Sequence, residues 1–546
     1  MANTTTATDP APGRTSDRPR AVRARVEGSW PARHWTPTLV VLGGLLLVAN
    51  VLPLYPGFMS FDSVMQLGQA LDPSTLADWH PPVMTALWWL LMELTGGTVG
   101  SMLVAQLGLL WAALTLLAVY VFRRSGRRLL SLLPLLLGVL PHVASTSAVI
   151  WKDGQLAFAL LGAVVLLLFV RRGADRVRLR RTAVAVAVLL LAYAGAVRYN
   201  ALPAIIPLLF LLTWPGTRRP RRYRVALAAA AVVGALVATP VIDAVRPVQE
   251  THPAASVMLD DVLHLYTLDE FRAADVSPPL RDYLVTLATT CPPETRDVNY
   301  TWRCANTTGT IPAVFLTHAD ELRGLYLTGI AEHPLDYAAF RLRVFGEFLH
   351  TPPEEVFVTW STIGPNPYGL VFEPNPVSRA LETYVGVTAR DLGVVFMPWA
   401  WLLAALVVLG LGRRRRASGE HAGVVLALAA SSVLYVVTYL PMVIGYDYRY
   451  VYWPAIAVSV AGVLLLLDRR TAAAGADPSP AVAEPEPAVT GESPAPDATA
   501  PLDLRPVAEP VLPRRAPSAR SGEGSGPTLA AARVAPARPS SPGSTS

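Results

Sequence analysis

One carboxylate with two amides on the same predicted helix face, in the stretch from Ser60 to Pro82, could form a site for base chemistry. Asp62, Gln66 and Gln69 stand at positions i, i+4 and i+7, which places them on one face of a helix. Ser60 is a suitable N-cap, and the partial positive charge at a helix N-terminus favours an ionised Asp62. An ionised carboxylate can act as general base toward a substrate hydroxyl, or it can help to hold a divalent cation. The ordinary alternative is that Asp62 only caps or solvates the helix end.

His80 follows in the same stretch and stands directly before Pro81 and Pro82. The residue before a proline is pushed out of helical geometry, and prolines are favoured in the first turn of the next helix. His80 is therefore held at a fixed place ahead of an apolar helix, and we include it with Asp62 among the candidate catalytic residues. The alternative, that this histidine only hydrogen-bonds to the backbone, stays open.

Three basic residues stand out in the polar segments between apolar runs. Lys152 is the single lysine of the chain, Arg198 ends an apolar run, and Arg449 lies among tyrosines. Such cations make strong charge-assisted hydrogen bonds to phosphate oxygens, so the three could bind one phosphate together. They also have ordinary roles, because Lys152 could pair with Asp153 and the two arginines could reach lipid headgroups or join an aromatic belt. The further residues that we expect to contact a substrate are Gln66, Asp153, Tyr199, Asn200, Tyr446 and Asp447.

The composition indicates that the elements carrying these residues lie in a membrane. The chain is 52% hydrophobic and only 16% charged, with a mean hydropathy of +0.39, whereas globular proteins have about 25% charged residues. Apolar runs of about 17 to 22 residues recur along most of the length, as helices that cross a bilayer require. The net charge of +6 does not indicate nucleic-acid binding, because the arginines cluster in short patches between the apolar runs.

The arginine patches predict the topology. All of them fall on the cytoplasmic side only if the apolar run 82–96 does not cross the membrane. That run is short and has Glu93 near its end, as expected of a re-entrant or interfacial helix. The predicted fold class is therefore an all-α polytopic protein of the cell membrane, with about ten transmembrane helices and both termini in the cytoplasm. The expected spans are 37–54, 102–122, 129–148, 154–170, 182–197, 201–215, 225–243, 391–411, 421–441 and 451–467.

This topology divides the chain into five parts and brings the candidate residues together on the outer face. The segment 246–390 is long enough for a small extracytoplasmic domain, and an outward position favours a disulfide between Cys291 and Cys304. The tail is rich in Ala, Pro, Ser and Glu and cannot bury a core, so we expect it to be disordered. The five parts are a basic cytoplasmic arm (1–36), an N-terminal transmembrane part with its first outer loop at 55–81 (37–245), the extracytoplasmic domain (246–390), the C-terminal helices (391–467) and the tail (468–546).

Several of these motifs resemble the GT-C superfamily of membrane glycosyltransferases. The nearest branches are the protein O-mannosyltransferases and the lipid A aminoarabinose transferases. The resemblance implies a GT-C-like bundle with interfacial helices in the first outer loop and a small extracytoplasmic domain. The motifs that carry it are an outward Asp62 soon after the first span, "HPP" at 80–82, "WKDG" at 151–154, "RYN" at 198–200 and "DYRYVYWP" at 447–454.

The resemblance also implies an activity, the inverting transfer of a hexosyl or pentosyl group outside the cytoplasm. The donor is a sugar on polyprenyl phosphate, and the acceptor is a glycan, lipid or protein of the cell envelope. Asp62 then corresponds to the first-loop acid that acts as base or positions the acceptor, His80 to the residue before the paired prolines, and Arg449 to the arginine that holds the donor phosphate. The chain departs from the pattern where Phe61 and Ser63 flank Asp62, because many members have two adjacent acids there. A divalent metal is therefore in doubt, and no other cofactor is implied.

The chemistry that the resemblance implies is also consistent with the properties of the residues. A lipid phosphate leaving group gains charge as the glycosidic bond breaks, and Lys152, Arg198 and Arg449 could stabilise it. Glycosidases need a second carboxyl group to protonate a poor leaving group, but a phosphate needs no such acid, so one catalytic carboxylate is enough.

Two other classes of function remain open. A transporter or lipid flippase usually has ionisable groups near the bilayer midplane, and the candidates here are only His142 and Asp243. A non-catalytic envelope scaffold could use the tail as a partner-binding arm. The discriminating observation is whether Asp62, His80, Lys152, Arg198 and Arg449 surround one site, because a transferase requires this and a scaffold does not.

Overall fold

The computed structural model covers the whole chain and describes residues 30–171, 177–213, 220–290, 313–350, 359–415, 419–443 and 445–475. Within these ranges the ordered elements are helices joined by loops, with three isolated β-bridges and no strand. The predicted all-α class is confirmed for this part of the chain. Cys291 and Cys304, the residues before 30 and the tail from 476 lie outside the described residues, so the predicted disulfide, arm and tail stay predictions.

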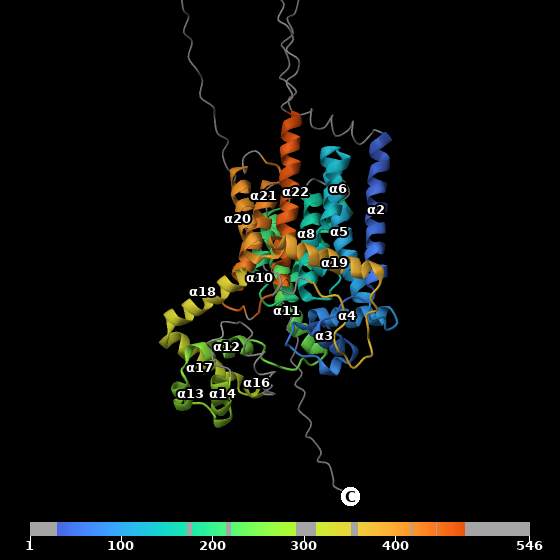
Figure 1. Cartoon of the computed structure of the whole chain (residues 1–546). Helices are drawn as coiled ribbons and strands as arrows, with labels where there is room; N and C mark the ends of the chain where they lie inside the picture. Colours follow the sequence, from blue (N-terminus) through green and yellow to red (C-terminus); the bar gives the residue numbers. More distant parts are fainter. Residues whose placement is uncertain are drawn as a thin grey trace, which may run out of the picture. The chain divides into compact units, whose positions relative to one another are not determined.

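Six helices among the described residues are long and apolar enough to cross a membrane (Figure 1). A seventh span is formed if the bent pair α6 (Arg128–Leu137) and α7 (Pro141–Ser147), which meet at 44°, counts as one. These helices indicate a membrane protein. The six are α2 (Trp30–Leu54), α5 (Ser101–Ser125), α8 (Lys152–Arg171), α9 (Val177–Ala196), α11 (Arg221–Val245) and α22 (Tyr452–Gly475).

The remaining three predicted spans form shorter helices. They are α10 (Leu202–Thr213), α20 (Pro398–Arg414) and α21 (Ala422–Val437). All three pack in the same bundle, because α10 lies against α21 and α21 lies between α20 and α22. The count of ten spans includes these three, and it stays a prediction.

Local sequence signals set the helix ends. Pro82, Pro141 and Pro398 stand in the first turn of α4 (Pro82–Leu94), α7 and α20, where the missing backbone N–H costs no hydrogen bond. Gly126 ends α5 with a φ of 68°, the left-handed conformation that glycine adopts without a steric penalty. Arginines in the last turns of α5 and α20 interact favourably with the partial negative charge of those helix ends.

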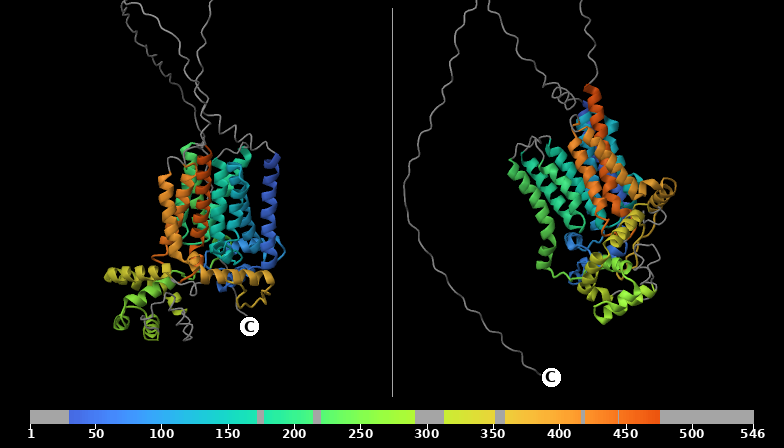
Figure 2. Two further views of the ribbon diagram at one scale, coloured as in Figure 1. Left: turned by 45° about the horizontal axis from the view of Figure 1, so that its top comes forward. Right: turned by 90° about the vertical axis from the view of Figure 1, so that its left-hand side faces the viewer.

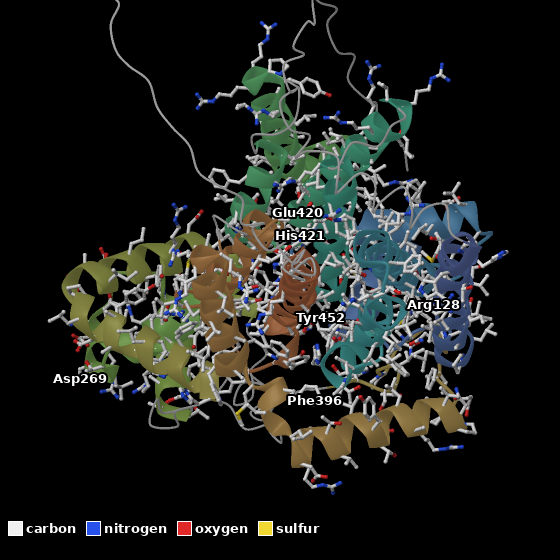
Figure 3. The ribbon with its side chains drawn as sticks, turned by 90° about the horizontal axis from the view of Figure 1, so that it is seen from above. Arg128, Asp269, Phe396, Glu420, His421 and Tyr452 are labelled. Carbon is white, nitrogen blue, oxygen red and sulfur yellow. The ribbon has the colours of Figure 1, made fainter. Side chains whose placement is uncertain are left out.

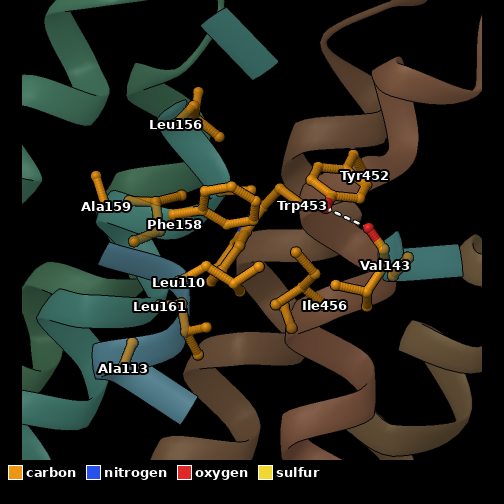
Figure 4. Packing of buried hydrophobic residues seen from close by; sticks show 14 of the residues in the cluster. Leu110, Ala113, Val143, Leu156, Phe158, Ala159, Leu161, Tyr452, Trp453 and Ile456 are labelled. Carbon is orange, nitrogen blue, oxygen red and sulfur yellow. Dashed lines mark hydrogen bonds between the residues drawn. The ribbon is translucent and has the colours of Figure 1, made fainter. Parts of the chain in front are cut away.

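The core lies around α8, which is buried on nearly every side by α5, α9 and α22 (Figures 1 and 2). Phe158 of α8 packs edge-on against Tyr452 of α22, with ring centroids 5.8 Å apart. The Tyr452 hydroxyl donates a hydrogen bond to the Val143 carbonyl of α7 at 2.7 Å, and Trp453 donates to Ser431 of α21 at 2.9 Å (Figure 4). These contacts fix the start of α8 relative to the start of α22. Lys152 is the first residue of α8, and Arg449 stands shortly before α22.

The segment that we predict to be the first outer loop contains two short helices, α3 (Phe61–Leu71) and α4, and their interfacial position stays a prediction. At 13 residues α4 is about 20 Å long, too short to cross a hydrocarbon core of about 30 Å without help. Ser60 is the N-cap of α3, but its side chain does not cap the helix; it accepts a hydrogen bond from Trp151 instead, at 2.7 Å. This bond ties the start of α3 to the start of α8.

The segment between α11 and α20 is also helical and has a hydrophobic cluster of its own. Leu259, Phe271, Leu284 and Phe315 are buried in this cluster, as expected of a unit with its own core. The extracytoplasmic position of the segment stays a prediction. Its helices are α12 (Ala255–Leu265), α13 (Leu268–Ala273), α14 (Pro278–Thr290), α16 (Ala313–Thr317), α17 (Ala319–Glu332), α18 (Pro334–His350) and α19 (Pro376–Asp391).

The arginine-rich helix ends lie together at one end of the bundle. Arg124 at the end of α5 forms an ion pair with Glu420 before α21, and Arg128 at the start of α6 stacks over the Trp35 ring of α2 at 5.1 Å (Figure 3). These contacts agree with the predicted clustering of basic patches on one side.

Candidate active site

Asp62 and Arg449 meet although 387 residues separate them in the chain. The Arg449 Nη1 donates to Asp62 Oδ2 at 2.8 Å, and the two side chains are 17% and 30% exposed. Asp62 lies in the first turn of α3, and Arg449 lies in the 3₁₀ turn Tyr448–Val451 that precedes α22. Burial opposes ionisation of Asp62, but Arg449, with His80 and Lys152 nearby, keeps the pKa of Asp62 below its ordinary value. The carboxylate is therefore ionised and already has a cationic partner.

Arg449 is held on several sides. Its Nε forms an ion pair with Asp447 Oδ2 at 2.8 Å, and its backbone N–H donates a hydrogen bond to Asp447 Oδ1 at 3.0 Å, so one carboxylate caps the turn and holds the guanidinium by charge. The guanidinium also lies over the rings of Trp151 and Tyr450, at 4.8 and 5.4 Å from the centroids. Burial raises the pKa of Asp447 to about 6, although Arg449 acts in the opposite direction.

His80 lies between Lys152 and Asp62. The ammonium of Lys152 donates to His80 Nδ1 at 2.6 Å, and His80 Nε2 lies 3.8 Å from Asp62 Oδ1. Burial, together with the neighbouring Lys152, lowers the pKa of His80 to about 3, so the imidazole is neutral at neutral pH. With Nδ1 accepting from Lys152, the ring proton stands on Nε2 and faces the Asp62 carboxylate.

Arg198 is linked to the cluster of Asp62, His80, Lys152 and Arg449 through one aromatic ring, that of Tyr450. Its guanidinium stacks over Tyr450 at 5.1 Å, on which Arg449 also stacks, and over Tyr439 at 5.7 Å. Arg198 forms an ion pair with Asp153 and donates to Asn200 Oδ1 at 3.1 Å. The structure therefore brings Asp62, His80, Lys152 and Arg449 into direct contact and places Arg198 in a second layer.

The remaining predicted substrate contacts have varied surroundings. Gln66 is buried one turn after Asp62, and its Nε2 has no hydrogen-bond partner among the described residues. Tyr199 is exposed, and its hydroxyl donates to the backbone carbonyl of Asp78 at 2.7 Å. Tyr446 donates to Glu347 of α18 at 2.5 Å. Asp153, Asn200 and Asp447 bond to the arginines described above.

A mostly apolar cavity of about 420 Å³ lies among the helices next in the chain to Asp62 and His80. Its walls come from α3, α4, α9 and α11, and Gln69 and Thr85 lie at its edge. Gln69 stands two turns after Asp62 on the same face of α3, and Thr85 stands about one turn after His80. Arg246 at the end of α11 also lines the cavity and stacks over Trp89 at 4.9 Å. The cavity thus shares α3 and α4 with the candidate site, although none of Asp62, His80, Lys152 and Arg449 is among its lining residues.

The residues that could hold a metal ion lie elsewhere. Glu420, His421 and Asp468 have ligand atoms within 4.8 Å of one another (Figure 3). His421 Nδ1 is bonded to Asp468 at 2.6 Å and its Nε2 to the Tyr120 hydroxyl at 2.7 Å, so both ring nitrogens are engaged in closing α5, α21 and α22 together. At the candidate active site Asp62 and Asp447 both bind Arg449, which occupies the place that a divalent cation between them would need.

Sequence reasoning missed the aromatic and acidic supports of this site. Trp151 and Tyr450 flank the Arg449 guanidinium, Tyr439 flanks Arg198, and Glu347 binds Tyr446. For Trp151 and Tyr450 a signal was present, because each stands directly beside a candidate cation in the chain. For Tyr439 and Glu347 no local signal exists, since both act across tertiary contacts.

No family model and no curated protein matches the chain. Among solved structures, the chain is similar to the archaeal oligosaccharyltransferase AglB from Archaeoglobus fulgidus, in complex with an inhibitory peptide and a dolichol-phosphate. The sequence identity is 12%, the TM-score is 0.34, and the match covers 80% of this chain. The chain spans 50% of the length of that structure. A structural similarity with this TM-score and identity does not support an inference about function.

Proposed function

We propose that the chain is a GT-C-type glycosyltransferase that moves a sugar from a polyprenyl-phosphate donor to an acceptor of the cell envelope, with inversion at the sugar. The observation that carries this proposal is the convergence of Asp62, His80, Lys152 and Arg449, which come from three separate segments of the chain. A carboxylate next to two cations at one end of a bundle of apolar helices combines a base with a phosphate site. A scaffold has no need for such a cluster.

The donor phosphate would bind to Arg449 and Lys152, with Arg198 adding positive charge from the second layer. Guanidinium and ammonium groups make the strongest hydrogen bonds to phosphate oxygens. When the bond between the sugar C1 and the phosphate oxygen breaks, the electron pair stays on the phosphate. The fixed cations then stabilise a charge that increases in the transition state, in a partly buried setting where electrostatic effects are large.

Asp62 would accept the proton of the attacking hydroxyl while the acceptor oxygen forms its bond to C1 from the opposite face. In the structure Asp62 is bound to Arg449, and a carboxylate with a lowered pKa is a weak base. A phosphate that takes over the guanidinium releases Asp62 and lets the pKa of this carboxyl return toward its ordinary value. The base therefore becomes competent only when the donor is in place.

His80 is assigned a positioning role. A neutral imidazole that accepts from Lys152 and presents Nε2–H toward Asp62 orients both groups without adding charge. The two prolines that follow fix its backbone at the start of α4.

The apolar cavity suits the lipid part of the donor. Gln69 and Thr85, which line it, stand on the helices at whose starts Asp62 and His80 lie. We propose that a donor with its phosphate at Arg449 extends its polyprenyl chain along these helices into the cavity. The cavity walls are mostly apolar, as burial of isoprene units requires.

The topology completes the proposal. With ten spans, both termini in the cytoplasm of a cell-membrane protein and the arginine patches inside, the cluster and the segment 246–390 face outward. The segment then stands beside the site and can select the acceptor, and a disulfide between Cys291 and Cys304 is compatible with this side.

A transport function has less support among the described residues. His142, the candidate for a midplane group, is bonded to Ser459 at 3.2 Å and packs against Trp401. Asp243 accepts a hydrogen bond from the backbone of Val248 at 2.8 Å near the end of α11. Both residues thus have structural partners.

The test is a transfer assay with purified full-length protein. Wild type is incubated with a panel of polyprenyl-phosphate hexoses and pentoses and with envelope extract as the source of acceptors, and release of polyprenyl phosphate is measured. We expect release with at least one donor, inverted anomeric configuration by NMR, and loss of transfer in Asp62→Asn.

The matched control is Asp72→Asn, which removes a charge from an exposed aspartate at the end of the same helix. This variant should retain transfer. Wild-type protein that releases polyprenyl phosphate from no donor contradicts the proposal, and undiminished transfer by Asp62→Asn removes Asp62 from the mechanism.

A further inference from the structure

A second cavity shares Gln69 with the apolar cavity. It is an open hollow of about 540 Å³ between α3 and the loop that leads into α19, and Met65, Gln69 and Tyr368 are among its lining residues. Gln69 is only 8% exposed, and it lines both cavities. Asp62 does not line the hollow, but Met65 and Gln69 stand one and two turns after Asp62 on the same face of α3. The helix that carries the proposed base therefore has a second, more polar cavity along it.

The loop before α19 follows α3 from its start. Met59 stands two residues before α3 and exchanges backbone hydrogen bonds with the loop. Its N–H donates to the Thr362 carbonyl at 3.0 Å, and its carbonyl accepts from the Gly364 N–H at 2.7 Å. Further along, Tyr368 reaches Gly68, where an added β-carbon would clash with the Tyr368 hydroxyl. The loop therefore lies beside α3 from the start of the helix to its second turn.

Tyr368 is held in place by the side chain of Asn366. The Asn366 Oδ1 accepts from the backbone N–H groups of Tyr368 and Leu370, at 3.1 and 3.0 Å. Its Nδ2 donates to the carbonyls of Gly364 and Leu370, at 3.0 and 2.8 Å. Even so, Tyr368 is 42% exposed. Glycine inside a helix is less stable than alanine, and the contact with Tyr368 explains why Gly68 is small. The hollow thus has a fixed aromatic ring with a free surface.

We propose that this hollow binds the acceptor and that the acceptor is a glycan; this inference rests on the function proposed above. A sugar ring has an apolar C–H face and hydroxyl groups along its edge. The ring of Tyr368 can pack on the face, and the amide of Gln69 can both donate to and accept from the hydroxyls. Asp62 lies about 10 Å from Gln69 along the helix axis, so a glycan that extends along α3 brings a hydroxyl to the base.

A peptide or a lipid acceptor fits this lining less well. Peptide sites offer free backbone groups, an apolar groove or a cluster of arginines. Here the backbone of the loop is bonded to Met59 and Asn366, and no cation is among the described residues that line the hollow. A lipid tail needs a more apolar wall, which the other cavity provides. Asp72 also lines the hollow, but its Oδ1 is bonded to the N–H and hydroxyl of Ser74, so we assign it no contact with the sugar.

The test measures glycan binding directly, with the full-length protein in nanodiscs. Dissociation constants for disaccharides of glucose, galactose, mannose and arabinose are obtained by saturation-transfer-difference NMR. The matched control for Tyr368→Ala is Tyr384→Ala, because Tyr384 of α19 is also 42% exposed and does not line the hollow. We expect wild type and Tyr384→Ala to bind at least one disaccharide equally, and Tyr368→Ala to bind it about tenfold more weakly. Tyr368→Phe keeps the ring and should bind almost as well as wild type.

A second variant guards against a loss of folding. Gly68→Ala keeps every side chain of the hollow but displaces the Tyr368 hydroxyl, so it should also weaken glycan binding, while thermal unfolding shows that the protein is folded. Equal affinity of wild type and Tyr368→Ala, or the absence of disaccharide binding by wild type, overturns the proposal. Binding of a serine- and threonine-containing hexapeptide in place of any disaccharide overturns it as well.

A separate readout distinguishes this inference from the proposed function. Binding of sugar-free polyprenyl phosphate depends on Arg449, so it should be the same in wild type and Tyr368→Ala. If wild type binds polyprenyl phosphate and releases it from a donor but binds no disaccharide, the glycan site is wrong and the proposed donor chemistry stands. If disaccharides bind in a way that depends on Tyr368 but no donor is cleaved, the glycan site stands and the proposed donor chemistry is wrong.

Discussion

Replacing Asp62 by asparagine should make the site bind polyprenyl phosphate more tightly while it abolishes transfer. Asp62 holds Arg449 at 2.8 Å, so a phosphate that binds to this guanidinium must displace the carboxylate. Asparagine keeps the size of the side chain but loses its charge. The guanidinium then has a weaker competitor, and the phosphate meets one negative charge fewer. A residue that only stabilises the fold would not give opposite signs for binding and transfer.

The magnitude follows from the exposure of the pair. Asp62 is 30% exposed and Arg449 17% exposed, so the pair is neither a free surface contact nor fully buried. Surface ion pairs contribute about 0–1 kcal/mol and buried hydrogen bonds to charged groups about 1.5–3 kcal/mol. A gain of about 1–2 kcal/mol lies between them and corresponds to a dissociation constant roughly 5- to 30-fold lower.

The assay is a titration of full-length protein in nanodiscs with sugar-free polyprenyl phosphate, followed by microscale thermophoresis. Asp72→Asn serves as the control, because it removes the same charge from the same loop at an exposed position away from Arg449. Its binding should equal that of wild type. Unchanged or weaker binding in Asp62→Asn would refute the exchange of carboxylate for phosphate at Arg449.

Three further predictions concern the groups around this pair. Arg449→Gln removes the cation that both Asp62 and Asp447 bind. The same titration should show that polyprenyl phosphate binds more weakly by about 1.5–3 kcal/mol, or roughly 10- to 150-fold. An unaltered dissociation constant would contradict the assignment of Arg449 as a phosphate-binding residue. The pKa of His80 is lowered to about 3, whereas a histidine in the unfolded chain titrates near 6.5. Between these pH values the folded protein therefore binds fewer protons than the unfolded protein. The contribution of His80 to stability is complete above pH 6.5 and is lost as the pH falls toward 3. Between pH 6.5 and pH 5 the free energy of unfolding should therefore fall by about 2 kcal/mol less in His80→Asn than in wild type. Denaturant unfolding at both pH values measures this difference. An equal fall in the two proteins would show that the pH dependence does not come from His80. Glu347→Ala and Tyr446→Phe each break the bond from α18 to the loop before Arg449, and each should raise the donor KM about threefold, with no further rise in the double variant. Fully additive effects would show that the two residues act separately.

The helices of the bundle could be predicted from the sequence because their signals are local. Apolar runs of sufficient length predict α5, α8 and α22, and the prolines after His80 predict the start of α4. The sequence predicts the start of α20 at 391, but the helix begins at Pro398. The division into six long helices, one bent pair and three short helices could not be read from hydropathy, because tertiary packing decides where a run ends.

The members of the candidate site could be predicted, but their pairing could not. The positive-inside rule predicts that Asp62, His80, Lys152 and Arg449 lie on the same side of the membrane. The sequence neighbour Asp153 suggested a pair with Lys152, yet it binds Arg198, and Lys152 turns to His80. Such choices depend on distances between residues far apart in the chain, which composition and spacing do not contain.

The pairing explains how a cluster of charges is tolerated between lipid and water. Lys152, Arg198 and Arg449 face Asp62, Asp153 and Asp447, so three cations meet three carboxylates and the local formal charge is close to zero. Unpaired charges in this partly buried place would cost several kcal/mol each, whereas a paired set is stable until a ligand replaces one partner. Asp153 and Asp447 are almost fully buried, whereas Asp62 is 30% exposed. Asp62 is thus the carboxylate that a phosphate can displace, and it is also the one whose release supplies a base.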